Sequence, residues 1–471
     1  MVKRDRVRVG EAAAEFRGAR LGDARNEARL EVIARQVAFE PAASLPQQAG
    51  SDAALEATYR FLSNRDVSFA SIMAPHVRAT VARCAEQDWV VVAHDTTGFN
   101  FGNREELGRL SGNGRGFLGH FAVAATLGEQ QLPLGVLHVE TIRRPVDEPK
   151  KQRNKHRAQA DESTESLRWN RGAQAVHQLL TGKARAIHVM DREADNYLLL
   201  AEMLGRGQDF VVRASYDRVV ERAGSRSLLK QVLESAPVVA ERAVPLSERR
   251  PHPSTRHRQR HPPREAHTAS LQISATRVRM VRPQGAQVCP QETLELNVVR
   301  VLEVNPPAGA EPVEWLLWTT LPASTADEVY TIVDAYRGRW VIEEYFKALK
   351  TGCAYEKRQL ESFHALLNAL AVFIPVAWLL LRLRTVSRLS PQSPGLPLLT
   401  DTQHRCLSAG LKHLKRPPLP DNPTARDIAY AVAGLAGHIK NNGDPGWQTL
   451  GNGLDRLLLI EIGYLAAKDE L

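Results

Sequence analysis

The sequence predicts an α/β protein whose partly parallel sheet is interrupted by a β-rich insertion and flanked by helical N- and C-terminal segments. Between residues 89 and 213, short apolar runs alternate with helical patterns, which is typical of βα units in a parallel sheet. Residues 219–320 are mostly strand-like, which indicates the insertion. Residues 10–85 repeat apolar side chains every three or four positions, which indicates helices.

Length, composition and charge exclude several classes of protein. The chain has 471 residues, which favours two or three domains. Hydrophobic residues make up 43% and charged residues 24% of the chain, which excludes a disordered or fibrous protein. The net charge of +9 lies in residues 143–157 and 247–267, because the rest of the chain is balanced. Two basic loops on a neutral body favour a polyanionic partner, nucleic acid before a membrane.

The sequence also favours a cytoplasmic protein. Its four cysteines lie far apart without the spacing of a zinc site, so we expect neither structural zinc nor a disulfide framework. The first residues lack the apolar stretch of a secretion signal. Residues 366–383 are long enough to suggest a membrane span, but Asn368, Pro375 and Arg382 interrupt them. We therefore expect a buried core helix there and no membrane contact.

The expected elements follow in chain order from these patterns. Before the insertion, we expect helices at 11–16, 26–38, 53–61, 163–180 and 195–204, and strands at 89–93, 116–127, 132–141, 187–190 and 210–213. Within and after the insertion, we expect strands at 271–281, 294–304 and 315–320, and helices at 325–350 and 366–383.

These elements suggest three domains. We assign residues 1–70 to a helical N-terminal domain and residues 71–390 to the α/β domain, with the insertion at about 215–320. Residues 391–471 form a helical C-terminal domain, to which the Ser/Pro-rich residues 390–397 serve as a linker.

Two aspartates follow two of the predicted apolar strands. Asp95 comes shortly after the run WVVVA, and Asp191 comes directly after IHVM. Open α/β sheets place ligand-binding groups at the carboxyl ends of their strands, so both carboxylates are candidate ligands of a hard cation such as Mg²⁺. An aspartate in this position is also common as a helix cap or turn residue, and for each aspartate alone this alternative stays open.

The predicted helix after the insertion carries a row of polar side chains. Spacings of three and four residues place on one face Tyr336, Arg339, Glu343, Lys347 and Lys350. We expect Trp340 and other apolar residues to anchor the rest of the helix in the core. An exposed ladder of ion pairs would show the same spacing, and this alternative is weakened only by the length of the row and the two upstream aspartates.

Three carboxylates on separate elements, beside a cationic helix face, predict a two-metal phosphodiester site. One ion would activate the attacking water or hydroxyl group, and the other would stabilise the leaving oxygen. Three close carboxylates repel one another without a cation, so we expect two Mg²⁺ ions, with Mn²⁺ as a substitute. The neighbouring cations suit the phosphates of DNA.

The same residues match a known motif. Tyr336, Arg339, Glu343 and Lys350 form the pattern Tyr-x2-Arg-x3-Glu-x6-Lys, which resembles the signature of the insertion-sequence-four group of bacterial DDE transposases. Other stretches resemble this family in the same order: LGDARNEARL near residue 21, ATYRF near 57, DTTGFNF at 95, MDREAD at 190, FVVRA at 210, EWLLW at 314 and YLAAKDEL at the C-terminus. The resemblance covers nearly the whole chain.

The resemblance implies a fold, a chemistry and an assembly. The catalytic core would be ribonuclease-H-like, and its metal-binding triad would be Asp95, Asp191 and Glu343. The N-terminal domain would bind the transposon end, and the C-terminal domain would form a homodimer. Phe39 and Glu40 depart from a basic and aromatic pair of the family, so we expect the recognition of the DNA end to differ.

The resemblance also implies a set of DNA contacts. The residues implied to hold the DNA end are Tyr336, Arg339, Lys347, Lys350, Trp315, Arg213, Arg29 and Arg60. Trp315 stands where the family stacks a flipped base, although a tryptophan on a strand is also common as a core residue. Taken alone, the three arginines outside the helix also fit solvated surface charges.

These observations favour a Mg²⁺-dependent cut-and-paste DNA transposase. Such an enzyme binds terminal inverted repeats, cleaves the ends by hydrolysis and hairpin formation, and joins the 3′ ends to target DNA. One alternative is a ribonuclease-H-like nuclease that cuts but does not join. Another is a DNA-binding repressor derived from a transposase, which would need no metal triad.

Overall fold

The computed structural model describes residues 12–104, 106–110, 114–128, 130–145, 165–246, 248–249, 251, 255, 262–307, 309–389, 391–439 and 443–468. Most of the basic segment 143–157 and much of 247–267 therefore lie outside the described residues. The N-terminal helices are η1 (Ala12–Phe16), α1 (Ala24–Phe39), α2 (Leu45–Ala49), α3 (Asp52–Ser63) and α4 (Phe69–Ala85).

Strands and short helices make up the middle of the chain. The strands are β1 (Trp89–Asn100), β2 (Gly108–Arg109), β3 (Arg115–Thr126), β4 (Pro133–Ile142), β5 (Arg185–Met190), β6 (Asp209–Arg213), β7 (Val219–Arg222), β8 (Ser225–Leu228), β9 (Val238–Leu246), β10 (His267–Val281), β11 (Thr293–Val304) and β12 (Glu314–Thr319). The helices among them are η2 (Glu165–Leu167), α6 (Arg168–Leu180), η3 (Arg192–Ala194), α7 (Tyr197–Gly205), α8 (Leu229–Glu234) and η4 (Gln284–Ala286).

Helices alone follow the last strand. They are α10 (Ala326–Gly338), α11 (Trp340–Lys347), the π-helical turn η5 (Ala348–Gly352), η6 (Tyr355–Lys357), α12 (Phe363–Leu389), η7 (Leu396–Leu398), α13 (Asp401–His413), α14 (Ala425–Leu435) and α15 (Trp447–Ala467). The predicted α/β class, with a partly parallel sheet and helical regions at both ends, is confirmed.

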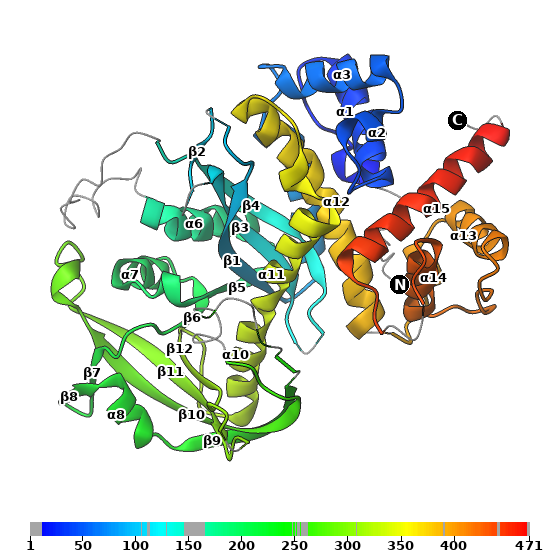
Figure 1. Ribbon diagram of the computed structural model, residues 1–471. Helices are drawn as coiled ribbons and strands as arrows, with labels where there is room; N and C mark the ends of the chain where they lie inside the picture. The colour runs from blue at the N-terminus through cyan, green and yellow to red at the C-terminus, as the bar shows by residue number, and fades with distance from the viewer. Residues whose placement is uncertain are drawn as a thin grey trace.

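All the described strands belong to one sheet. Its order is β2-β3-β1-β5-β6-β12-β11-β10-β7-β8, with β4 paired to β3 and β9 paired to β10. Strands β1, β5 and β6 are parallel, and β12 pairs antiparallel with β6. The strands of the insertion therefore extend the central sheet rather than forming a separate one (Figure 1).

The central strands are buried because helices cover both of their faces. In β1, Val90 and Val92 pack with α6 residues such as Val176 on one face. Val91 of β1 packs on the other face with residues of α10 such as Val333. Apolar side chains on both faces are typical of a parallel sheet, which explains the uninterrupted valine run that marked this strand in the sequence.

Helix α12 joins the N-terminal helices, the sheet and the C-terminal helices (Figure 1). By length and composition it is the one described helix apolar enough to cross a membrane, yet 89% of its apolar window is buried inside the protein. Its Asn368 is fully buried, and the side-chain amide donates hydrogen bonds to the carbonyl oxygens of Leu62 and Val67, both at 3.0 Å. The polar residue that interrupts the apolar run thus fixes α12 against the N-terminal helices.

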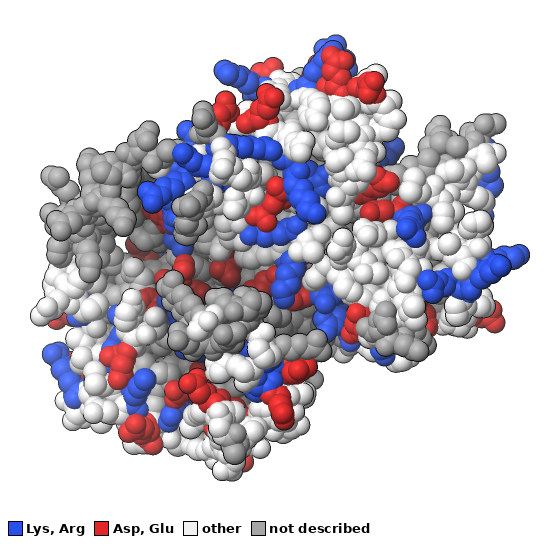
Figure 2. Space-filling view, in the orientation of Figure 1, with Lys and Arg blue, Asp and Glu red and all other residues white. Residues whose placement is uncertain are grey.

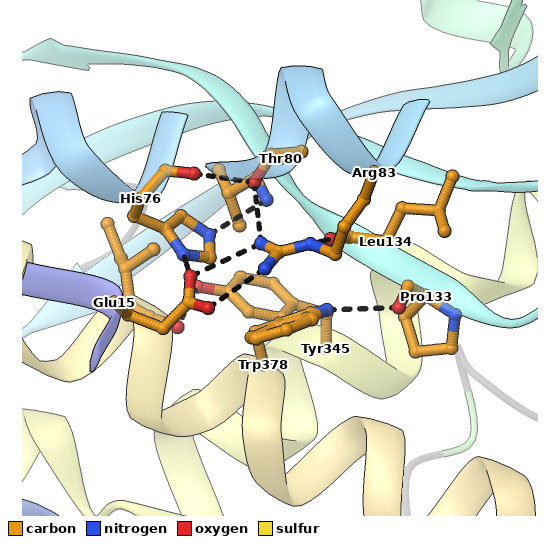
Figure 3. A network of polar contacts seen from close by, with 10 residues as sticks. Glu15, His76, Thr80, Arg83, Pro133, Leu134, Tyr345 and Trp378 are labelled. Carbon is orange, nitrogen blue, oxygen red and sulfur yellow. Dashed lines mark hydrogen bonds and ion pairs between the residues drawn. The ribbon is translucent and has the colours of Figure 1, made fainter. Parts of the chain in front are cut away.

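A buried polar network fixes the start of the described chain (Figure 3). Glu15 of η1 accepts hydrogen bonds from Nδ1 of His76 at 2.5 Å and from Nη1 of Arg83 at 2.8 Å, both on α4. The Arg83 guanidinium lies 4.1 Å from the ring centre of Trp378 on α12, whose indole N–H donates to the Pro133 carbonyl at 3.0 Å. One carboxylate therefore connects η1, α4 and, through Arg83, α12.

Two sequence predictions about the site elements were wrong. The strand predicted at 89–93 was expected to end before Asp95. Strand β1 instead continues through Asp95 to Asn100, because it pairs antiparallel with β3. The helix predicted at 325–350 is three segments: α10 and α11 are separated at Arg339, and the last turn is π-helical. Arg339 itself keeps right-handed helical angles, so the break changes the helix locally without reversing its direction.

Candidate active site

Parallel pairing of β1 and β5 brings Asp95 and Asp191 to the same level of the sheet. The last paired residues are Ala93 and Val189, and two residues further along each chain are Asp95 and Asp191. Beyond this point β1 pairs only with β3, whereas the chain after β5 turns into η3. The two carboxylates therefore lie where neighbouring parallel strands part, which is where α/β sheets bind ligands.

Each aspartate is held by a backbone N–H group just beyond it. The Thr96 N–H donates to Oδ1 of Asp95 at 2.7 Å, and the Glu193 N–H donates to Oδ1 of Asp191 at 2.8 Å. The second contact is a helix cap, because Asp191 is the N-cap of η3. In both residues this contact uses Oδ1, so Oδ2 can bind a different partner.

Glu343 is linked to Asp95 through Arg339. The Arg339 guanidinium donates from Nη1 to Oδ2 of Asp95 at 3.3 Å and from Nη2 to Oε1 of Glu343. These three side chains are mostly buried, with exposed fractions of 15%, 22% and 29% for Arg339, Asp95 and Glu343. Arg339 therefore supplies positive charge between carboxylates of β1 and α11.

The charges of Asp191 and Glu343 both contribute to the electrostatic environment of Asp95. The pKa of Asp95 is raised to about 6, chiefly by burial, against the lowering effect of its hydrogen bond from the Thr96 N–H. The negative charges of Asp191 and Glu343 contribute to this raised pKa, and the positive charge of Arg339 opposes it. Both other acids thus lie close enough to act on Asp95.

The donor chemistry of this cluster fits a hard divalent cation. Three carboxylates offer the oxygen ligands that Mg²⁺ and Mn²⁺ prefer. Within the described part of the chain, however, no three acidic, histidine or cysteine side chains are close enough together to hold a metal ion as they stand. Arg339 supplies the compensating charge in this arrangement, and Asp95, Asp191 and Glu343 are the residues that would hold the ion.

The two lysines of the predicted row do not bind Glu343. Lys347 pairs with Glu344 at 2.7 Å and lies 5.2 Å from the ring centre of Trp340. Lys350 reaches back from the π-helical turn to the Gly98 carbonyl on β1. Arg339 and Glu343 therefore share a face and are bonded, whereas the continuous ion-pair ladder, which was the alternative interpretation of the spacing, is not seen among the described interactions.

Trp340 was expected in the core and is instead 54% exposed. It is the first residue of α11, directly after the break at Arg339. A continuous helix would give no reason to expect this exposure, and the break is not visible in the spacing of apolar residues. An exposed ring beside a lysine is a surface on which nucleic-acid bases can stack.

Three other predicted DNA contacts form a second cluster on the adjoining strands. Trp315 of β12 packs edge-to-face on Tyr336 of α10, with ring centres 5.1 Å apart. Arg213 of β6 donates to the Glu314 carbonyl at 3.1 Å, and its electrostatic partners include Tyr336 and Arg339. Burial lowers the pKa of Arg213, against the raising effect of Tyr336. This cluster adjoins the carboxylates through Arg339.

The remaining predicted contacts lie on the N-terminal helices. Arg29 is half-buried on α1, and Arg60 is exposed on α3, where it pairs with Glu56. Arg168, the first residue of α6, also adjoins the aspartates, and no pattern in the sequence marks it. It is buried, and it contacts Thr96 beside Asp95 and Glu193 beside Asp191. Because these contacts join segments far apart in the chain, no local pattern marks them.

The surface view agrees with this grouping. Figure 2 shows acidic side chains in a hollow in the middle of one face, over the region where Figure 1 labels β1, β5 and α11. Lys and Arg side chains lie beside this hollow. An acidic centre with cations around it suits a metal-dependent reaction on a polyanion.

Comparison with protein families assigns two parts of the chain. Residues 11–67 match the family described as transposase DNA-binding, and residues 170–374 match the family described as transposase DDE domain. The first match covers α1, α2 and α3, and the second runs from α6 into α12 and includes Asp191 and Glu343.

The chain therefore carries the DNA-binding and DDE domains of a DNA transposase. The fold of its catalytic domain is ribonuclease-H-like, its partner is DNA, and domains of this kind generally use divalent metal ions to cleave DNA.

Proposed function

We propose that this protein is a cut-and-paste transposase whose metal-binding triad is Asp95, Asp191 and Glu343. The observation that supports this proposal most directly is that Asp95 and Asp191 lie where β1 and β5 separate, while Arg339 bonds Asp95 to Glu343 of α11. The enzyme would bind terminal inverted repeats, cleave them through a hairpin intermediate and join the 3′ ends to target DNA.

The chain's own residues would position the reacting groups. Asp95 and Asp191 keep one oxygen fixed by a backbone N–H, so their orientation is set before DNA arrives. Two Mg²⁺ ions, when bound, would activate the attacking oxygen and stabilise the leaving oxygen of a phosphodiester. Arg339 is already bonded to Asp95 and Glu343 and would turn toward the phosphate as the carboxylates take up metal.

DNA contacts would extend from this centre along two elements. Lys347 and Lys350 would hold backbone phosphates beside α11, and Tyr336, Trp315 and Arg213 would hold the DNA end beside β12. Residues 1–70, with Arg29 and Arg60, would bind the transposon end at a distance from the cut.

The wider assignment rests on the sequence motif. We place the protein in the insertion-sequence-four group, where its motif is similar to that of the transposase of transposon five. Residues 71–390 would be the catalytic domain and residues 391–471 the dimerisation domain, so that two copies hold two ends in a synaptic complex. We expect it to act in the cytoplasm, on the nucleoid.

The triad is tested by three conservative variants. Asp95→Asn, Asp191→Asn and Glu343→Gln should each lower Mg²⁺-dependent cleavage of end DNA by at least about 10³-fold, because each removes a ligand charge. Binding of the same DNA without metal should change by less than about threefold, since the ligands do not contact phosphate directly. A variant that still cleaves at the wild-type rate would remove its residue from the triad.

The hairpin step is tested at Trp315. Trp315→Ala should slow hairpin formation at least about tenfold more than the first nick, because only the hairpin requires an unpaired base to stack outside the helix. Gel analysis of end-labelled DNA separates the two products. Equal slowing of both steps would leave Trp315 with only its packing role against Tyr336.

The same assays decide between this proposal and its alternatives. A nuclease without strand transfer would yield cut ends that never join target DNA, whereas a repressor would bind end DNA without cutting it. The three carboxylates favour catalysis over repression, because a DNA-binding repressor gains nothing from buried acids that repel one another.

A further inference from the structure

Arg168 lies behind the two aspartates, on the opposite side of the strands from Glu343. It is the first residue of α6 and is only 9% exposed. Helix α6 approaches the sheet closely at Gly172, one turn further along, where an added side chain would require its neighbours to shift by a few tenths of an ångström. A Cβ atom there would lie 3.0 Å from Nε2 of His120 on β3. The position of Arg168 relative to the strands is therefore set by tight packing.

The guanidinium of Arg168 donates in three directions. Nε donates to Oγ1 of Thr96 at 2.8 Å, and Nη2 donates to Oε2 of Glu193 at 2.8 Å. Nη1 donates to the Glu165 carbonyl in the preceding turn at 3.0 Å. The planar fork of an arginine can hold these partners at fixed relative positions, which the single ammonium group of a lysine cannot do.

The two side-chain partners of Arg168 are the residues that hold the aspartates. Thr96 donates its backbone N–H to Oδ1 of Asp95, and Glu193 donates its backbone N–H to Oδ1 of Asp191. One guanidinium thus contacts the residue after Asp95 on β1 and the second residue after Asp191 in η3. A shift of Arg168 would change the distance between the carboxylates as well as their direction.

We propose that Arg168 is a positioning residue that sets the separation of Asp95 and Asp191 for binding a divalent cation. It acts through Thr96 and Glu193 and touches neither metal nor DNA. This inference rests on the proposed role of the two aspartates as metal ligands. Groups that orient metal ligands from behind typically change metal affinity by about 10–100-fold when removed.

The direct test is the affinity of the DNA-free protein for Mn²⁺, measured by titration calorimetry. Arg168→Met keeps the length of the side chain but removes its donors, and the dissociation constant for Mn²⁺ should rise by about 10–100-fold. Arg168→Lys should recover only part of the affinity. The cleavage assay should need more Mn²⁺ for half-maximal rate, while the maximal rate stays within about threefold of wild type.

Arg171→Met is the matched control on the same helix. Arg171 pairs with Glu140 on β4 at 2.5 Å, so its guanidinium is bound to a strand that carries neither aspartate. Its loss should leave the Mn²⁺ affinity unchanged. An equal loss of affinity in both variants, or wild-type affinity in Arg168→Met, would overturn the proposal.

Two further variants keep the test decisive if Arg168→Met does not fold. Thr96→Val and Glu193→Met each remove one hydrogen-bond acceptor of the guanidinium, and each should weaken Mn²⁺ binding several-fold. Unchanged affinity in both would overturn the role of Arg168. Wild-type Mn²⁺ affinity in Asp191→Asn would instead contradict the metal-binding function on which the inference rests, so the two failures are distinguishable.

Discussion

At the scale of single residues, Arg339 is the group whose removal should be most informative. It is mostly buried and bonds Asp95 and Glu343, so Arg339→Gln leaves two carboxylates without their compensating charge. We expect the free energy of unfolding without metal to fall by about 1–3 kcal/mol. Because Mn²⁺ would restore the missing positive charge, it should raise the melting temperature of the variant more than that of wild type.

Arg337 provides the control for this measurement. It lies on the same helix and pairs with Asp334 at 3.0 Å, away from the carboxylates. Arg337→Gln should show the wild-type response to Mn²⁺ in thermal unfolding. If Arg339→Gln gains no more from Mn²⁺ than Arg337→Gln does, Arg339 and the metal do not compete for the same carboxylates.

Individual site residues could be predicted from the sequence only where they belong to one local pattern of residue spacing. Asp95 and Asp191 follow apolar runs, and Arg339 and Glu343 are four residues apart on a helix, so their positions could be inferred. Arg168 could not be inferred, because its role depends on contacts with Thr96 and Glu193, which are 72 and 25 residues away in the chain. Spacing along a chain carries no information about such contacts.

At the scale of elements, the packing of α4 on β4 depends on one glycine. Gly135 has φ of +147°, and a Cβ atom there would lie 2.1 Å from Oγ1 of Thr80 on α4. It sits at an irregularity in the pairing of β3 and β4. Gly135→Ala combines backbone strain with a steric clash, so we expect a loss of about 2–4 kcal/mol in the free energy of unfolding.

Gly128 separates these two effects. Its φ is +118°, but a Cβ atom there would meet nothing within 4 Å. Gly128→Ala should therefore cost only the backbone term, about 1–2 kcal/mol. Urea unfolding of both variants measures the difference. Equal losses would mean that α4 moves away from β4 without cost.

Helices and strands were predicted well where the local sequence pattern determines them, and less well where contacts with neighbouring elements determine their ends. The runs at 187–190 and 210–213 appear as β5 and β6 because their apolar residues are buried on both faces. The extension of β1 through Asp95 arises from pairing with β3, and the break at Arg339 occurs where that residue reaches across to Asp95. Both are tertiary effects that override the local preference.

At the scale of the whole molecule, one apolar core runs through all three parts of the chain. The same cluster contains Phe16 near the N-terminus, Phe121 of the sheet, Trp378 of α12 and Leu454 of α15. The DNA-binding helices therefore do not form a core of their own. A substitution in η1 should also affect the packing of the catalytic domain. This connection could not be predicted from domain boundaries, which assume separate cores.

Glu15 tests this connection, because its network fastens η1 to α4 and α12 (Figure 3). Burial alone would raise its pKa, but hydrogen bonds and charges from His76 and Arg83 outweigh burial and lower the pKa to about 2. The lowered pKa means that the ionised form is favoured by folding. The stability it contributes is present above pH 4.5 and is lost as the pH falls toward about 2.

Burial lowers the pKa of His76, against the raising effect of Glu15. The Val136 N–H donates to Nε2 at 3.1 Å, which leaves the proton on Nδ1 for Glu15. The network therefore needs the carboxylate as its acceptor, and the carboxamide of Glu15→Gln accepts less strongly from both partners. The variant should lose about 3 kcal/mol of unfolding free energy at pH 7, an upper value from the pKa shift.

The measurement is urea unfolding of wild type and Glu15→Gln between pH 7 and pH 2.5, with Glu56→Gln as control. Glu56 pairs with Arg60 on the surface and is 63% exposed, so its substitution should change stability by less than about 0.5 kcal/mol at every pH. The difference between wild type and Glu15→Gln should shrink as the pH falls below 4.5, since wild type then protonates the same carboxylate. A difference that stays constant with pH would mean that the loss comes from altered packing of η1 and not from the charge of Glu15. A loss that also lowers end cleavage would show that the anchoring of η1 reaches the catalytic domain through the shared core.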